Sequence, residues 1–520
     1  MSPTSQHLTA LTAILVSLSA VRAASAQTPQ GFDPSLACSA IKSLRLPDVR
    51  LTVVADAADS LSRPDSVHTP HCRVSGIIGR EIVFTTMLPY RWNQRLLMGG
   101  NGGFAGSIET AVFQQTRNGY VTVSTNTGHE ASGITARWAL DQPERQVNYG
   151  SVAVHRTVEV AKALARAFYG TDPRYSYFFG CSNGGRQALI EVQRYPDDFD
   201  GVIAGAPAAH LSLMPGVFLK NVREDFPTPA YYTHPVITRE NLDLLSSKII
   251  EACDAIDGVR DGILTDPRDC KFKLASIPLC AAGRPAADCL TAAQRSAIAR
   301  IYAPATDEKG RVVYPGQPFG GESLPGGWSI WIVGNDSAFL RSEHQPSLAM
   351  AFMTEGARYL IFGDSTWNYS TYHGSLFPES RHVASLGDAT ETDLRPFAAH
   401  KGKLILYHGW ADPALNPLAT IDYYQKVLAR DPAAREYVRL FLLPGVLHCA
   451  GGSGPSEVDW MAAITDWTEH AQPPEQLVAS THDRAGRSVR TRPICPYPKR
   501  PTYSGAGNTD NASSFACREP

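Results

Sequence analysis

Short apolar runs alternate with amphipathic segments between residues 81 and 195. Buried strands are predicted where β-branched and aromatic residues cluster, at 81–84, 95–98, 120–124 and 175–179. Helices are predicted where apolar residues recur at helical spacing, at 152–169 and 186–195. Strands that alternate with helices in this way indicate an α/β fold built on a mostly parallel sheet.

The alternation stops near residue 211 and returns after residue 390. The segment between holds four of the ten cysteines, many prolines and glycines, and scattered aromatic residues. We interpret it as a lid inserted over the sheet, because a chain of 520 residues exceeds the usual size of one compact domain. A strand, a helix and a second strand are predicted to complete the core, at 403–409, 418–429 and 437–442. The sequence therefore predicts a core formed by residues 27–210 and 391–520, with a lid at residues 211–390 inserted between its two parts.

The N-terminus carries the pattern of a signal peptide. An apolar stretch at 8–21 leads to the Ala-x-Ala pattern of residues 24–26, which predicts a cleaved signal over residues 1–26. The alternative is a buried or disordered N-terminus, since no Lys or Arg precedes the stretch. No other segment approaches the ~20 apolar residues that a spanning helix needs. We therefore expect a secreted or periplasmic protein that does not act on a membrane.

The cysteines agree with export. Their number, ten, is even, which suits an oxidising compartment. Their order suggests local pairs, namely Cys38 with Cys72, Cys253 with Cys270, Cys280 with Cys289, and Cys495 with Cys517. Cys181 and Cys449 then remain for each other, although sequence alone does not fix the connectivity.

The charge balance excludes some classes of partner. The formal net charge is −2, and 19% of the residues are charged. This balance gives no electrostatic reason to expect nucleic acid or an anionic membrane. A small neutral or weakly charged substrate fits the composition better.

One motif predicts a catalytic nucleophile. Residues 180–184 read Gly-Cys-Ser-Asn-Gly, the G-x-S-x-G form of a nucleophile elbow, after a predicted strand and before a predicted helix. A serine hydroxyl needs an imidazole to take its proton and a carboxylate to orient that imidazole. In α/β-hydrolases these follow in the order Ser, Asp or Glu, His. Ser182, Asp412 and His448 have that order, each on the turn or loop that follows a predicted strand.

Other residues compete for these roles. Asp412 precedes a proline and could belong to a simple turn, so three more carboxylates stay open, those of Asp364, Asp422 and Asp459. His408 could be the base, but it lies on the same loop as Asp412, so we expect it to line the substrate pocket. Cys181 could be a buried free thiol.

A glycine-rich loop at 99–103 is expected to help stabilise an oxyanion. The backbone N–H of Asn183, directly after the nucleophile, would supply one donor. Gly102 is the preferred second donor, and Gly99 and Gly100 remain possible. A tight turn is the simpler interpretation, and both can hold.

An Asp-rich loop at 253–263 suggests a calcium site. Hard cations take oxygens from carboxylates and backbone carbonyls. Side chains and carbonyls could come from five positions, Asp254, Asp257, Val259, Asp261 and Ile263. The spacing is not that of an EF-hand, and a solvated Asp/Gly turn is the alternative.

At these residues the chain resembles the tannase and feruloyl esterase family, over nearly its whole mature length. The most specific motifs are Cys181-Ser182 with His448-Cys449, the Asp-rich loop, and residues 492–498, Arg-Pro-Ile-Cys-Pro-Tyr-Pro. The resemblance implies an α/β-hydrolase core with a lid, a bridge between Cys181 and Cys449, and structural calcium in the lid. It also implies that Ser182, Asp412 and His448 form the triad. Trp331 and His408 match positions that line the pocket.

The resemblance says less about the substrate. Family members that act on the terephthalate monoester carry an arginine and a Ser/Phe-rich stretch in the lid to hold a free carboxylate. This chain lacks that stretch after Trp331, and Arg341 aligns only loosely. Leu415 replaces an aromatic residue that can close the pocket, which suggests a roomier site.

The expected function is that of a secreted serine carboxylesterase. Its substrates would be esters of aromatic acids, feruloyl, other hydroxycinnamoyl or galloyl, cleaved through an acyl-enzyme intermediate. Alternatives are a terephthalate-monoester hydrolase and an acyltransferase with the same triad. A calcium-dependent binding protein on an inactive hydrolase scaffold is a further alternative.

Overall fold

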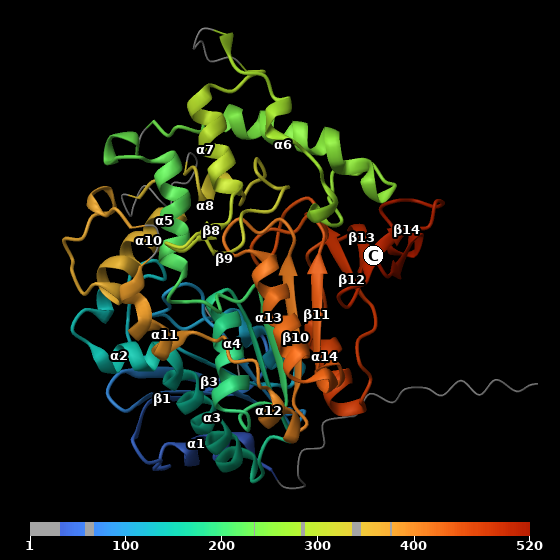
Figure 1. Cartoon of the computed structure of the whole chain (residues 1–520). Coiled ribbons are helices and arrows are strands. Elements are labelled where there is room, and N and C mark those ends of the chain that lie inside the picture. The colour runs from blue at the N-terminus through green and yellow to red at the C-terminus, as the bar shows by residue number, and fades with distance from the viewer. Residues whose placement is uncertain (1–31, 58–66, 233, 282–286, 335–344, 375–376) are drawn as a thin grey trace, which may run out of the picture.

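A nine-stranded mixed sheet forms the centre of the molecule (Figure 1). The computed structural model describes residues 32–57, 67–232, 234–281, 287–334, 345–374 and 377–520. The predicted signal peptide and Arg341 lie outside the described residues.

The strands of the sheet include all those that the apolar runs predict. Across the sheet they lie in the order β1 (Val49–Ala57), β2 (His71–Ile78), β3 (Ile82–Pro89), β5 (Val121–Thr125), β4 (Arg95–Gly99), β6 (Tyr175–Cys181), β7 (Gly201–Gly205), β10 (Lys403–Gly409) and β11 (Val438–Leu443). The pairs from β1 to β5 are antiparallel, and those from β5 to β11 are parallel. The carboxyl ends of β6, β10 and β11 therefore lie along one edge.

Both faces of the sheet are buried, because alternate side chains of each central strand enter different cores. Leu404 and Leu406 of β10 pack into one cluster, whereas Ile405 and Tyr407 pack into another. Helices contribute to the first cluster from α1 (Pro34–Ile41), α3 (Ala153–Tyr169), α4 (Asn183–Arg194) and α13 (Pro417–Arg430), and to the second from α14 (Trp460–His470). This is the α/β-hydrolase fold that the sequence predicts.

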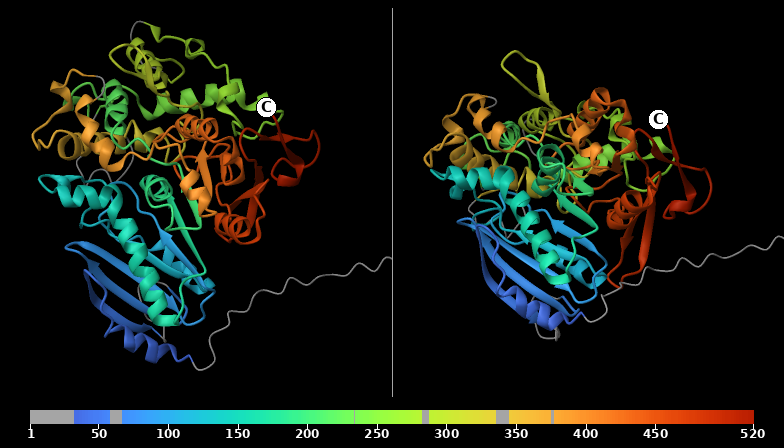
Figure 2. Two further views of the ribbon diagram at one scale, coloured as in Figure 1. Left: turned by 60° about the horizontal axis from the view of Figure 1, so that its bottom comes forward. Right: turned by 90° about the horizontal axis from the view of Figure 1, so that it is seen from below.

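Most of the described part of residues 211–390, the predicted lid, lies over the carboxyl ends of the parallel strands, whereas its last helix, α11 (Arg381–Gly387), lies at the side of the sheet near α2 (Pro143–Val147) and α4 (Figures 1 and 2). The α-helices described in this segment are α5 (Met214–Asp225), α6 (Arg239–Cys253), α7 (Ala292–Tyr302), α8 (Trp328–Trp331), α10 (Leu348–Glu355) and α11. Some of them share a cluster with core residues such as Phe104 and Leu415, so the lid is packed onto the core. Within the described ranges, no helix combines the length and apolarity needed to span a membrane.

Smaller elements complete the chain. They are α2 (Pro143–Val147), α12 (Arg395–Ala399), and three two-stranded sheets formed by β8 (Ala305–Thr306) with β9 (Val312–Tyr314), β12 (Leu477–His482) with β13 (Ser488–Ile494), and β14 (Arg500–Tyr503) with β15 (Phe515–Arg518).

All ten cysteines form disulfides. The pairs are those that the order of the cysteines suggests, Cys38–Cys72, Cys253–Cys270, Cys280–Cys289, Cys495–Cys517 and Cys181–Cys449. Four of these close short loops, whereas Cys181 and Cys449 are 268 residues apart. That bridge joins the two parts of the core.

Candidate active site

Ser182 occupies a sharp turn between β6 and α4. Its φ of 64° and ψ of −121° are costly for a residue with a side chain. The turn requires glycine nearby, since a Cβ atom on Gly180 would lie 2.5 Å from the carbonyl of Gly184. The helix begins at Asn183, before its predicted start at 186, because the chain enters it directly from the turn. This geometry is that of a nucleophile elbow.

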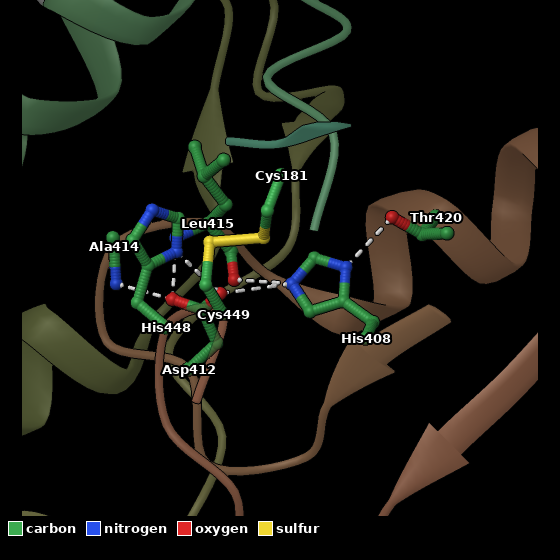
Figure 3. Close-up of a disulfide and its surroundings, with 8 residues drawn as sticks. All are labelled: Cys181, His408, Asp412, Ala414, Leu415, Thr420, His448 and Cys449. Atoms are coloured by element: carbon green, nitrogen blue, oxygen red, sulfur yellow. Dashed lines mark hydrogen bonds and ion pairs between the residues drawn. A yellow bond between two sulfur atoms is a disulfide. The ribbon is translucent and has the colours of Figure 1, made fainter. Parts of the chain in front are cut away.

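Asp412 and His448 meet at the same edge of the sheet, after β10 and β11 (Figure 3). The Nδ1–H of His448 donates to Oδ2 of Asp412 at 2.8 Å. The other oxygen, Oδ1, accepts the backbone N–H groups of Ala414 and Leu415 at 2.8 and 2.9 Å. Burial alone would raise the pKa of Asp412, but the adjacent histidines and their hydrogen bonds hold it well below its usual value. An ionised Asp412 keeps the proton of a neutral His448 on Nδ1, so Nε2 is left as the basic atom.

The competing carboxylates lie elsewhere. Asp364 is exposed and accepts hydrogen bonds from Thr366. Asp422 pairs with Lys426 on the surface of α13, and Asp459 caps α14. The structure therefore places Asp412, and none of these three, against His448.

His408 is not where the sequence analysis expects it. It does not line the substrate pocket but is fully buried on β10, behind Asp412. The reason is the tight turn after β10, which folds Asp412 and Leu415 back over the histidine ring. Its Nε2 lies 3.1 Å from Oδ2 of Asp412 and 3.0 Å from the carbonyl of Leu415.

The Cys181–Cys449 disulfide ties the elbow to the His448 loop (Figure 3). Cys181 directly precedes Ser182, and Cys449 directly follows His448. The Cα atoms of the two cysteines are 6.0 Å apart, so the candidate nucleophile and base belong to loops that are covalently joined. The alternative of a free thiol at Cys181 is wrong.

The glycine-rich loop lies beside Ser182. Gly102 and Gly103 line the same open cleft as Ser182 and His448. Gly100 is a poorer candidate donor, because its N–H already donates to the carbonyl of Phe179. The N–H of Asn183 is the first of α4, where the backbone N–H groups lack an intrahelical acceptor.

Ser182 lies where two cavities meet. The inner cavity contains about 620 Å³ of space and the outer cleft about 1560 Å³, each including space open to solvent. Residues that line both are Gly103, Ser182, Trp331, Phe352 and His448. An ester bound across this junction would place its two halves in different cavities.

The inner cavity is walled by apolar side chains from the core and the lid. Trp331 and Leu415 line it, where the resemblance places them. Most of the wall is not predicted from the sequence, including Phe104, Tyr149, Met214, Phe218, Phe352 and Ile361. Gly103 is also missed, although it stands next to Gly102 in the glycine run. The wall residues come from distant segments and carry no local signal that separates them from ordinary core.

The Asp-rich loop supplies oxygen ligands but is held by its own hydrogen bonds. Oδ1 of Asp254 accepts the N–H of Gly262 at 2.9 Å, and Oδ2 of Asp257 accepts the hydroxyl of Thr265 at 2.6 Å. Asp261 pairs with Arg492. Burial raises the pKa of Asp257 and Asp261, which a bound cation would oppose. The donor chemistry therefore fits a hard cation.

A second cluster lies between α3 and α4. Among the described residues, His155, Glu191 and Asp198 are the group of possible metal ligands whose atoms all lie within 4.8 Å of one another. However, Nδ1–H of His155 donates to Asp198 at 2.6 Å, a hydrogen-bond distance. Burial raises the pKa of Glu191 well above its usual value, which favours the neutral acid. The cluster is therefore a hydrogen-bonded histidine and aspartate beside a buried glutamate.

Comparison with known proteins gives the family. The family model described as tannase and feruloyl esterase matches residues 67–518. An uncharacterized esterase of Xanthomonas campestris is 34% identical, and the match covers 93% of this chain and 91% of the relative. The mono(2-hydroxyethyl) terephthalate hydrolase of Piscinibacter sakaiensis is 31% identical, over 86% of this chain and 85% of the relative.

A solved structure shares the fold. Feruloyl esterase B from Aspergillus oryzae superposes with a TM-score of 0.81 at 24% identity, covering 94% of this chain and 100% of that one. With a family match over most of its length, the chain belongs to the tannase and feruloyl esterase family.

Proposed function

We propose that this esterase-family protein is a secreted serine carboxylesterase that hydrolyses esters of aromatic acids through an acyl-enzyme intermediate. The observation that carries the proposal is the placement of Ser182, on a strained elbow, in the lining of the same two cavities as His448, which is hydrogen-bonded to a buried, ionised Asp412. All three stand at the carboxyl edge of the sheet, and the junction of two cavities lies in front of Ser182 and His448.

The chemistry follows from these positions. Oγ of Ser182 attacks the ester carbonyl while Nε2 of His448 takes its proton, and Asp412 stabilises the imidazolium that forms. The N–H groups of Asn183 and of Gly102 or Gly103 stabilise the oxyanion. When the C–O bond breaks, His448 returns the proton to the leaving alcohol. Water, activated by His448 in turn, then attacks the acyl-enzyme and releases the acid.

The inner cavity suits an aromatic acyl group. In this cavity the ring of Trp331 stacks with those of Phe218 and Phe352. The ring centroids of Trp331 and Phe352 are 6.1 Å apart, and their planes are inclined by 16°. Among the described residues that line this cavity, His448 is the one with a side chain that can carry charge. A neutral ring would therefore be bound without an unpaired charge. The outer cleft, which includes Glu109 and Gln115, is left for the alcohol.

Hydrolysis of a terephthalate monoester is the second candidate. The relative from Piscinibacter sakaiensis, named for that substrate, supports it. The apolar wall of the inner cavity opposes it, since a buried carboxylate without a partner is costly.

Calcium and export complete the proposal. Asp254, Asp257 and Asp261, with the carbonyls of Val259 and Ile263, would hold a structural calcium ion in the lid, far along the chain from the nucleophile. Calcium would supply positive charge to carboxylates that burial otherwise disfavours. Five disulfides favour an oxidising compartment.

Ser182→Ala should abolish ester hydrolysis, because no other group would then attack the carbonyl. We expect kcat for a chromogenic aromatic ester to fall by roughly a thousandfold or more. Labelling by a fluorophosphonate should be lost as well. Ser385→Ala, which changes an exposed lid serine, is the control and should keep both. Retained hydrolysis in Ser182→Ala would reject the assignment.

A matched panel of esters tests whether the inner cavity binds a neutral aromatic acyl group. With the alcohol held constant, kcat/KM for a neutral aromatic acyl group should exceed that for the terephthalate monoester by roughly tenfold or more, because the apolar wall offers a carboxylate no partner. Initial rates for cinnamoyl, feruloyl, galloyl and terephthaloyl esters give the comparison. A preference for the terephthalate monoester would favour the second candidate instead.

Cys181→Ala with Cys449→Ala should impair turnover more than folding. Without the bridge, the elbow and the His448 loop are no longer tied, and we expect kcat to fall by roughly ten- to a hundredfold. The matched control is Cys280→Ala with Cys289→Ala, which opens a lid loop and should leave kcat nearly unchanged. Melting temperatures of both double variants separate the two effects. Equal kcat in the two double variants would show that turnover does not require the Cys181–Cys449 disulfide.

Calcium removal should destabilise the lid. A cation that binds only the folded loop adds to stability, so chelation should lower the melting temperature by ~5 °C, and added calcium should restore it. Asp254→Asn with Asp257→Asn should no longer respond to either treatment. An unchanged melting temperature of the wild-type protein on chelation would contradict the site.

A further inference from the structure

Both ring nitrogens of His408 have hydrogen-bond partners, and Asp412 is one of these partners (Figure 3). Its ring is fully buried at the end of β10. Nε2 lies 3.1 Å from Oδ2 of Asp412 and 3.0 Å from the carbonyl oxygen of Leu415. On the opposite side of the ring, Nδ1 lies 2.8 Å from the hydroxyl of Thr420. Each ring nitrogen therefore has a partner.

The partners fix the tautomer of His408. The Leu415 carbonyl and the ionised Asp412 carboxylate can only accept, so Nε2 must carry a proton and donate to both. The hydroxyl of Thr420 can donate to Nδ1, which satisfies a neutral ring. His408 thus presents an N–H to the oxygen that also receives the Nδ1–H of His448.

We propose that His408 is a positioning residue for the esterase reaction, acting through the Oδ2 atom that it shares with His448. The inference rests on the proposed function. Two N–H groups hold Oδ1 and two hold Oδ2, so the carboxylate of Asp412 cannot rotate away from His448. By donating to Oδ2, His408 also draws part of its negative charge away from His448 and moderates the basicity of the catalytic histidine.

Nε2 of His408 also connects Asp412 to the wall of the inner cavity. Leu415 lines the inner cavity, its N–H binds Oδ1 of Asp412, and its carbonyl accepts from His408. A role limited to holding this wall would alter substrate binding, and hence KM. A role in orienting Asp412 would alter kcat and its pH dependence.

Burial favours the neutral form of two other titratable groups near this network, Tyr314 and His210. Tyr314 of β9 receives the N–H of Asn416, and burial raises its pKa. His210 packs edge-on to Tyr314, and burial lowers its pKa. A change in the pH profile can therefore be assigned to Asp412, His448 and His408.

The test compares His408→Leu with His408→Gln in the full-length mature protein. Leucine removes the donor, whereas glutamine places an amide N–H near the position of Nε2. For His408→Leu we expect kcat to fall by roughly ten- to a hundredfold with little change in KM. The acidic limb of kcat/KM should move to higher pH by roughly half a unit to one unit, because Asp412 then gives its full charge to His448. His408→Gln should recover both most of the way.

Two further variants keep the test decisive. Should His408→Leu fold poorly, adding Thr420→Val removes the orphaned hydroxyl and keeps the volume. His155→Leu is the matched control, since it removes a histidine hydrogen bond to a carboxylate, that of Asp198, away from the site. It should leave the pH profile unchanged.

The outcomes separate this inference from the proposed function. An unshifted profile in His408→Leu, or a loss of activity that His408→Gln does not recover, would overturn the positioning role. A rise in KM alone would assign His408 to the pocket wall instead. Fluorophosphonate labelling and ester hydrolysis by the wild-type protein report on the proposed function itself, whatever the His408 variants do.

Discussion

The buried carboxylate of Asp412 is the group on which the arrangement of the site depends. An ionised carboxylate without access to water is unstable unless donors surround it. Asp412 has four, from the backbone of Ala414 and Leu415 and from the rings of His448 and His408. These donors come from β10, the turn after it and the loop after β11. The charge therefore exists only when both strands and both loops are in place, and the fold at this edge is stable only when the charge is paired.

Much of the sheet could be predicted because its central strands are buried on both faces. β10 and β11 are continuous apolar runs, which is what two-sided burial requires. The apolar pattern of the sequence does not predict β7, and the packing of this strand explains why. A Cβ atom on its Gly205 would lie 2.1 Å from the ring of Tyr407, so close contact with a neighbour, and not hydrophobicity, selects the residue there. Such contacts between strands far apart in the sequence leave no periodic pattern.

The candidate triad was accessible from sequence for a different reason. Ser182, Asp412 and His448 each follow a strand, and parallel strands bring their carboxyl ends together. The position of His408 was not accessible, because it depends on how tightly the turn after β10 folds back. The same holds for the inner cavity, whose wall joins Phe104 of the core to Phe352 of the lid. Order along the chain locates strand ends, but it does not say which side chains meet across an inserted segment.

The Cys181–Cys449 bridge has a consequence for the order in which the fold and its covalent link form. Cys181 is the last residue of β6, and Cys449 lies 268 residues later, in the loop after β11. The bridge therefore forms only after the two parts of the core have assembled. A chain kept reduced would have no covalent link between its nucleophile and its base. This covalent link therefore depends on oxidising conditions, as the other four disulfides do.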